Sequence, residues 1–353
     1  MQFIRNVFSS FFSLDNYGDS EHEYDHFPTT MEEFGYHFDE NGKLRQLSNG
    51  IKRIDIHGRR ITMPALILFL LDEPFQYEVE RGNRQYNQAH YEALGACIGH
   101  HIEEVLMTKY HLQRLQVPLK EPNDHEDIPR SHIYISQNTL TTADTLLVLL
   151  QGSGTIRPGQ WSRRVIMNES LEVSLNQLQF YHLGSMFPYI ERAQRNGWSI
   201  MILNPNYNEI AYEDGDGQDF GGEGGLSFVI QTACILKGAK LRNITAIAAG
   251  YGGHAMSVLA TQNALDFTQR VDALALTDSL HSKSNIKGRP VIDWFNNHVC
   301  HWVASKEKLD TEMPYHTRDA SCPCVSSGHT KSEFTPGAAK DSIMKYLESE
   351  IRK

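Results

Sequence analysis

Four short apolar runs constrain the fold of this 353-residue chain more than any other feature. They span residues 145–150, 199–203, 244–249 and 273–276, and a segment of small or polar residues follows each run at once. None of them alternates strictly between apolar and polar residues, which is typical of strands that are buried on both faces. The runs therefore predict a parallel sheet in the interior of a domain.

Helical patterns precede and separate these runs. Apolar residues recur at three- and four-residue spacing over 86–112, 186–197, 226–237 and 254–267, which predicts helices there. Because strand, turn and helix repeat along the chain, the predicted fold class is α/β, with a mostly parallel sheet and helices on both faces.

The flanking segments divide the chain into a tail and one domain. Residues 1–26 lack periodicity and are predicted to be a flexible N-terminal tail, followed by a single domain over 27–353. The domain opens with a small extension at 27–50, in which Asn41-Gly42 signals a tight turn between two short segments. We further expect an insertion at 51–71 and a flexible Gly/Asp loop at 213–225.

Composition excludes several classes of protein. A net charge of −10 argues against a protein that coats nucleic acid by bulk electrostatics. The apolar run at 64–71 is too short to span a bilayer, and the first residues lack the unbroken apolar region of a secretory signal. An odd number of cysteines without a disulfide framework favours a reducing compartment. These features predict an intracellular protein with no membrane association.

Potential metal ligands are present but scattered in the sequence. Cys322-Pro-Cys324 is the one close cysteine pair, and without a second pair at ligand spacing it is interpreted as two ordinary thiols in a loop. The histidines considered lie in different predicted elements: His100, His101, His281, His298 and His301. A lone histidine is more often a satisfied polar residue than a ligand. We therefore predict no metal and no cofactor.

One strand-to-helix turn carries the main functional inference. Chemistry in an open parallel sheet lies at the carboxyl ends of the strands. A serine hydrolase of this architecture places its nucleophile there, on a sharp G-x-S-x-G turn. In residues 248–252 the small flanking residues are present, but Gly250 occupies the central position. Without an oxygen or sulfur atom there, no acyl-enzyme can form; a plain glycine turn is the alternative interpretation.

Two loops would border the predicted pocket. The first, Gln151, Gly152, Ser153 and Gly154, follows a predicted strand and is either an oxyanion-type loop or a plain turn. The second contains Tyr251, Gly252 and Gly253. From composition alone neither loop is decisive.

Several segments together resemble the Argonaute-binding-protein-two domain family, in its animal cotranscriptional-regulator branch. The resemblance runs from about Phe27 to the C-terminus. The segments that carry it are Phe27-Pro28 with residues 34–36, residues 91–95, 152–154 with 159–161, 204–206, 251–253, 276–279 with His281, 297–302, and Cys322-Pro323 with Val325-Ser326.

The resemblance implies a fold and a setting. The fold is α/β-hydrolase-like. The partners would be proteins of the Argonaute, chromatin or splicing machinery, with at most indirect or weak RNA association. The roles implied are siRNA binding, heterochromatin formation and splicing regulation. The location implied is the nucleus, with the cytoplasm as a second location.

The sequence departs from the family pattern at the catalytic positions. Gln151 stands where the family has the histidine of His-Gly-Ser-Gly, and Ala249-Gly250 stands where it has His-Ser. Ser332 stands where a late histidine is expected, and His329 lies three residues earlier as a substitute. Asp278 alone is retained. The nucleophile and the base of a triad are therefore both missing, which predicts a pseudoenzyme.

Three hypotheses remain open at this point. The first is a non-catalytic scaffold, for which Trp161, Arg163 and Arg164 are candidate partner contacts, since Trp and Arg are frequent interface anchors. The second is a hydrolase with a different nucleophile; its candidates are Ser153, Ser257 and Ser279, with Asp278, His281 or His329 as partners. The third is a remnant without molecular function.

Overall fold

The computed structural model describes most of the predicted domain. The described residues are 27–39, 42–47, 73–117, 131–137, 139, 144–168, 184–206, 241 and 243–351, with backbone alone at 53–54 and 60–61. The predicted tail at 1–26, the apolar run at 64–71, the Gly/Asp loop at 213–225 and the helix at 226–237 lie outside them.

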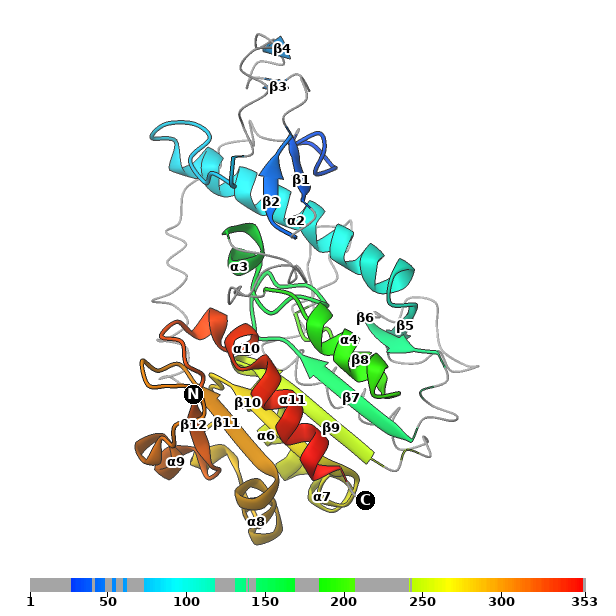
Figure 1. Cartoon of the computed structure of the whole chain (residues 1–353), viewed down its shortest axis with the longest axis vertical. Coiled ribbons are helices and arrows are strands. Elements are labelled where there is room, and N and C mark those ends of the chain that lie inside the picture. The colour runs from blue at the N-terminus through cyan, green and yellow to red at the C-terminus, as the bar shows by residue number, and fades with distance from the viewer. Residues whose placement is uncertain are drawn as a thin grey trace, which may run out of the picture.

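An eight-stranded sheet forms the centre of the fold, in the order β12-β11-β10-β9-β7-β8-β6-β5 (Figure 1). Its strands are β5 (Leu112–Val117), β6 (Ser131–Ser136), β7 (Thr145–Leu150), β8 (Ser199–Ile202), β9 (Asn243–Ala249), β10 (Val271–Thr277), β11 (Val299–Val303) and β12 (Cys324–Ser326). β6 is antiparallel to both of its neighbours, and all other pairs are parallel. The prediction of a mostly parallel sheet is confirmed.

Helices cover both faces of the sheet. One face packs against α2 (Arg84–Thr108), α4 (Phe187–Arg195) and α11 (Lys340–Glu350). The other packs against α6 (Tyr251–Gln262), α7 (Ala264–Arg270) and α8 (Arg289–His298). Shorter helices are α3 (Arg163–Asn168), α9 (Pro314–Ala320), α10 (Thr335–Ala338), η1 (Lys283–Asn285) and η2 (Ser332–Phe334). No helix within the described part combines the length and apolar character that crossing a bilayer requires.

Strand β7 shows why the apolar runs do not alternate. Leu147 and Leu149 belong to the core under α2, α4 and α11. Leu146, Val148 and Leu150 belong to the core under α6, α7 and α8. Burying each such side chain stabilises the fold by about 1.5–3 kcal/mol. A polar residue at any of these positions would face one of the two cores.

Capping residues set helix bounds that differ from the bounds predicted from periodicity. The side chain of Asn83 accepts a hydrogen bond from Tyr86 N at 3.0 Å, so α2 begins at Arg84 rather than 86. It ends at Thr108, and Leu112 starts β5 instead of ending the helix. The helix predicted at 254–267 is divided at Asn263, whose φ of −122° and ψ of 42° are not helical.

The N-terminal extension contains the expected hairpin. β1 (Tyr36–Phe38) pairs antiparallel with β2 (Leu44–Gln46), and Gly42 adopts a φ of 68° in the connection. Within the predicted insertion, β3 (Arg53–Ile54) pairs with β4 (Arg60–Ile61).

The outer side of β12 is covered by the chain itself. Met313 N donates to Cys324 O at 2.8 Å, and Ser326 N donates to Thr311 O at the same distance. The segment 311–313 therefore continues the hydrogen-bonding pattern of the sheet beyond its last strand.

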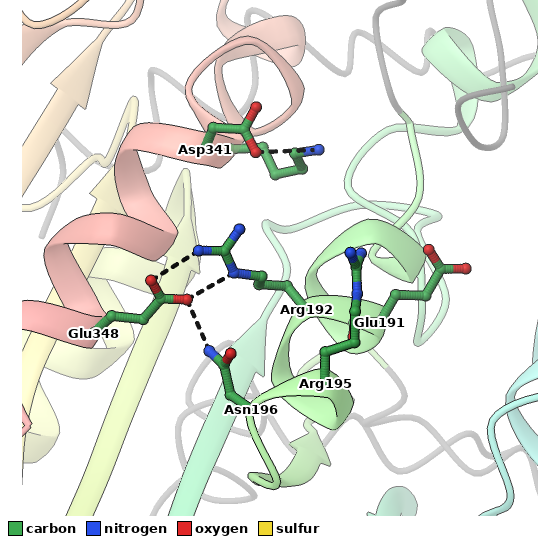
Figure 2. A network of polar contacts seen from close by, with 7 residues as sticks. Glu191, Arg192, Arg195, Asn196, Asp341 and Glu348 are labelled. Atoms are coloured by element: carbon green, nitrogen blue, oxygen red, sulfur yellow. Dashed lines mark hydrogen bonds and ion pairs between the residues drawn. The ribbon is translucent and has the colours of Figure 1, made fainter. Parts of the chain in front are cut away.

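An ion pair connects α4 to α11, which lie side by side on the same face (Figures 1 and 2). Arg192 donates from Nε to Glu348 Oε1 at 2.7 Å and from Nη2 to Glu348 Oε2 at 2.8 Å. Asn196 Nδ2 donates to the same carboxylate at 2.7 Å. The hydrogen bonds from Arg192 lower the pKa of Glu348 below its ordinary value. The pair thus fixes the C-terminal helix to the middle of the domain.

Replacing Glu348 with glutamine is expected to lower the free energy of unfolding at pH 7 by about 0.5–1 kcal/mol, since both partners are partly exposed. Because the folded-state pKa of Glu348 is lowered, the contribution is present above its unfolded value of about 4.3 and is lost as the pH falls through the folded value. Urea unfolding at pH 7 and pH 3.5 measures this. Asp293→Asn breaks the more exposed Arg289–Asp293 pair and serves as the control. An equal difference between wild type and Glu348→Gln at both pH values would contradict the assignment.

Candidate functional site

Gly250 lies between β9 and α6 with the backbone of a strained turn. Its φ is 50° and its ψ is −119°, outside the helical and strand regions. Its N–H donates to Thr277 O at 3.0 Å, and its carbonyl accepts from Leu280 N at 3.0 Å and Gly253 N at 3.2 Å. The predicted sharp turn is therefore present, and we call residues 248–252 the elbow.

The elbow has room for a side chain that it does not carry. A Cβ built on Gly250 would meet nothing closer than Gly152 Cα, at 3.9 Å. A serine is therefore sterically possible there, with only the strain of a positive φ, which nucleophile elbows accept. The missing nucleophile is thus a matter of residue identity and does not follow from crowding.

The first loop passes directly over the elbow. A Cβ on Gly152 would lie 3.5 Å from Ala249 O and 3.9 Å from Tyr251 N. Asn206 holds the loop, since its Nδ2 donates to Gly152 O at 2.8 Å and to Ile156 O at 3.0 Å. Asn206 was not among the predicted site residues, although its place in an Asn-Pro-Asn turn directly after a strand could have indicated a residue that holds a loop at the strand end.

Gln151 is fully buried at the start of this loop, and neither atom of its amide has a hydrogen-bond partner among the described residues. The Gln151 side chain therefore makes no hydrogen bond with the described residues at the position where the family pattern has histidine. Ser153 and Gly154 lie further along the loop and are exposed.

Two glycines bring the first turn of α6 close to its neighbours. A Cβ on Gly252 would lie 2.8 Å from Gln151 O and 3.0 Å from Leu150 O. A Cβ on Gly253 would lie 1.9 Å from Ser279 Oγ. These positions require glycine because backbone or side-chain atoms already occupy the space.

Asp278 follows β10 but faces a backbone amide. Its φ is 41°, its N–H donates to Trp302 O at 2.8 Å, and its Oδ1 accepts from Ala304 N at 3.2 Å. Across the described chain no hydrogen bond joins its carboxylate to an imidazole. The retained acid is thus engaged in joining the ends of β10 and β11.

The late loop does not supply a base in hydrogen-bond contact with this acid. Ser332 is exposed at the start of η2, and its carbonyl accepts from Thr335 Oγ1 at 2.8 Å. The His329 ring lies tilted against Phe334 with ring centroids 4.5 Å apart, and its Nδ1 accepts from Lys331 N at 3.1 Å. His329 therefore contacts residues of its own loop, Lys331 and Phe334.

The sequence profile of the Arb2 domain matches residues 70–217 and 227–309, which is more than half of the chain. The chain belongs to the Arb2 domain family. The resemblance predicted from short segments is thereby confirmed.

Relatives in the Arb2 family cover most of this chain. The "Cotranscriptional regulator ARB2A homolog" of Xenopus tropicalis is 29% identical over 92% of this chain and 81% of its own length. The corresponding Dictyostelium discoideum protein is 24% identical over 92% of this chain and 80% of its own length. The human "Putative protein ARB2BP" is 27% identical over 79% of this chain and 83% of its own length.

Two solved hydrolases align with this chain at low TM-scores. A thermostable Pseudomonas putida esterase aligns with a TM-score of 0.36 and 10% identity, over 78% of this chain and 99% of its own. The epoxide hydrolase CorEH aligns with a TM-score of 0.35 and 13% identity, over 68% and 98%. The mostly parallel sheet and the elbow of this Arb2 domain themselves give it an α/β-hydrolase-like fold.

Two of the three predicted partner contacts are buried. Trp161 is 4% exposed and Arg163 is 8% exposed. Arg163 donates to Thr155 O and lies against α2 where Gly95 leaves space, since a Cβ there would be 2.7 Å from Arg163 Cδ. The prediction that these two side chains form a contact surface is therefore wrong, because Trp161 belongs to the core and Arg163 packs against α2. Arg164 alone is exposed, and it pairs with Glu333 at 3.7 Å.

The histidines considered as metal ligands lie in different surroundings. His101 stacks on Phe38, and His298 stacks on Trp294. His281, which follows β10, and His301, in the middle of β11, by contrast lie with ring centroids 5.3 Å apart. Cys322 and Cys324 are both buried; Cys322 lies in a loop as predicted, whereas Cys324 belongs to β12, so the prediction of a loop thiol is wrong for Cys324. We call His281, His301, Cys322 and Cys324 the His/Cys cluster.

Proposed function

We propose that this Arb2 domain is a non-catalytic α/β-hydrolase-like regulator that acts through protein partners. The observation that carries the proposal is Gly250, which has the elbow backbone but no atom that could attack a substrate. Removal of the nucleophile from a serine hydrolase typically reduces the rate by about six orders of magnitude. The imidazole base is missing from its expected position as well, so no acyl transfer is expected.

The names of the relatives support a setting in cotranscriptional regulation. Within it we propose partners from the Argonaute, chromatin or splicing machinery, with a role in heterochromatin formation, siRNA pathways or splicing, in the nucleus. Because the net charge is −10, RNA is expected to associate through the partners rather than with the domain itself.

Affinity purification of the tagged full chain from nuclear extract tests this setting. We expect Argonaute, chromatin or splicing proteins to be recovered above a tag-alone control, and RNase treatment to leave the protein contacts in place. Gly250→Ser is the matched variant, and it should recover the same proteins because the partners do not depend on the elbow. Recovery of none of these classes by wild type would overturn the proposed setting.

Restoring the serine alone is expected to leave the protein inert. Gly250→Ser has space for its side chain, but Asp278 is bonded to Ala304 N and Ser332 offers no imidazole. Treatment with a fluorophosphonate probe should therefore give no labelling at position 250, as judged by intact-mass spectrometry. Labelling at that position would show that a base reaches the elbow and would contradict the pseudoenzyme assignment.

One contact favours a second candidate, a hydrolase that uses Ser279. Its Oγ lies 2.8 Å from His281 Nδ1, which is the geometry of a nucleophile and its base. However, burial, together with the neighbouring His301, lowers the pKa of His281 to about 4, far from the value near 7 that suits a general base. The hydroxyl also packs against Gly253. Fluorophosphonate labelling that disappears in Ser279→Ala would favour this candidate over the scaffold.

A further inference from the structure

The His/Cys cluster joins residues of two neighbouring strands and of two loops. His301 is in the middle of β11 and Cys324 begins β12, while His281 follows β10 and Cys322 precedes β12. His281 is 7% exposed, His301 6% and Cys322 0%. Four side chains with nitrogen and sulfur donors are thus enclosed together in the part of the core that adjoins the elbow.

The donor atoms are spaced as a small cation requires. Cys322 Sγ lies 3.8 Å from His281 Nε2, and Cys324 Sγ lies 3.7 Å from His301 Nδ1. The donors of His281, His301 and Cys322 all lie within 4.8 Å of one another. A tetrahedral zinc ion with Zn–N bonds near 2.0 Å and Zn–S bonds near 2.3 Å has ligand-to-ligand separations of about 3.3–3.8 Å. The donors of His281, His301 and Cys322 must move closer together to reach these separations, and Cys324 Sγ must move in from its position beside His301 Nδ1.

We propose that His281, His301 and Cys322 bind one Zn²⁺ ion, with Cys324 as the fourth ligand. Imidazole and thiolate ligands favour Zn²⁺ over the oxygen-seeking ions Mg²⁺ and Ca²⁺. Four protein ligands would make it a closed structural site, without an open position for a substrate.

Ser279 supports the imidazole of His281 on the side away from the cluster. Its Oγ contacts His281 Nδ1 at 2.8 Å, and a zinc-binding histidine usually makes such a hydrogen bond with its other nitrogen. Without metal, His281 Nε2 can donate to Ala320 O, which lies 3.0 Å away. A serine hydroxyl can donate or accept, so His281 can change tautomer and free Nε2 for the ion without losing this contact.

His301 is the weaker of the two nitrogen ligands. Its Nε2 accepts from Ser279 N at 2.8 Å, which places the ring proton on Nδ1, towards Cys324. Binding of zinc through Nδ1 moves this proton to Nε2 and breaks that hydrogen bond. Loss of Cys322 should therefore weaken binding more than loss of His301.

The test uses the purified full chain, kept reduced and stripped of metal. Zinc is titrated against a chromophoric chelator, and cobalt is bound in parallel, since tetrahedral Co²⁺ with thiolate ligands gives intense visible bands and a sulfur charge-transfer band. We expect one ion per chain. Cys322→Ala should weaken zinc binding about 100-fold or more and His301→Ala about 10-fold, in line with the effects of altering metal-site contacts.

Matched variants keep the result interpretable. Cys300→Ala removes the thiol next to His301, outside the cluster, and should bind zinc as wild type does. His281→Gln is a second ligand variant in case Cys322→Ala does not fold, which circular dichroism shows. The proposal is overturned by a stoichiometry far below one, by unchanged binding in both ligand variants, or by a Cys322–Cys324 disulfide in place of metal binding.

Discussion

Replacing Trp161 with alanine is expected to lower the free energy of unfolding by about 3–5 kcal/mol, the cost of deleting a large aromatic side chain from a core. Trp161 meets Tyr189 edge to face, with centroids 5.6 Å apart, and the Tyr189 hydroxyl donates to Pro336 O at 2.6 Å. The indole thus packs against the residue of α4 that bonds to α10. Urea unfolding followed by circular dichroism measures the change.

An exposed aromatic residue provides the control for this experiment. Tyr315 is 74% exposed on α9, so Tyr315→Ala should change the free energy of unfolding by less than about 0.5 kcal/mol. A Trp161→Ala protein that unfolds like wild type would return Trp161 to the partner surface that the sequence suggested. A broad, non-cooperative transition in wild type itself would favour the remnant hypothesis.

Introducing a methyl group at Gly252 is expected to cost about 1–3 kcal/mol, the usual range for overpacking. The Cβ of Gly252→Ala would meet the carbonyl oxygens of Gln151 and Leu150 at 2.8 and 3.0 Å. Both are backbone atoms, so α6 itself must move away from β7. Thermal unfolding measures the loss.

Gly250→Ala is the matched variant for Gly252→Ala, two residues away. Its Cβ meets only Gly152 Cα at 3.9 Å, so its cost is limited to the positive φ, about 1–2 kcal/mol. A Gly252→Ala protein as stable as wild type would show that α6 does not pack against β7 as described.

The predictable part of the fold was its centre. β7 and β9 are buried on both faces, and such strands are apolar at nearly every position, so their sequences reveal them. β5, β6, β11 and β12 did not give this signal, because they carry polar side chains. β11 includes Cys300 and His301, and β12 has only three residues. Their places depend on pairing between distant segments, which local periodicity does not encode.

The predictable part of the site was the elbow. It is contiguous in sequence, so the glycine at position 250 could be placed on a strand-to-helix turn without coordinates. The burial of Arg163 could not be predicted from the local sequence, because it depends on Gly95 in a helix more than sixty residues earlier. The proximity of His281 to His301 likewise depends on the parallel pairing of β10 and β11.

The cover over β12 restricts how copies of this domain can associate. Thr311 and Met313 already occupy hydrogen-bonding positions along that strand. A strand from another molecule cannot dock there without first displacing them, so this end of the sheet is closed to β-augmentation and to edge-to-edge aggregation. Partners approaching this end must recognise side chains and loops instead of extending the sheet.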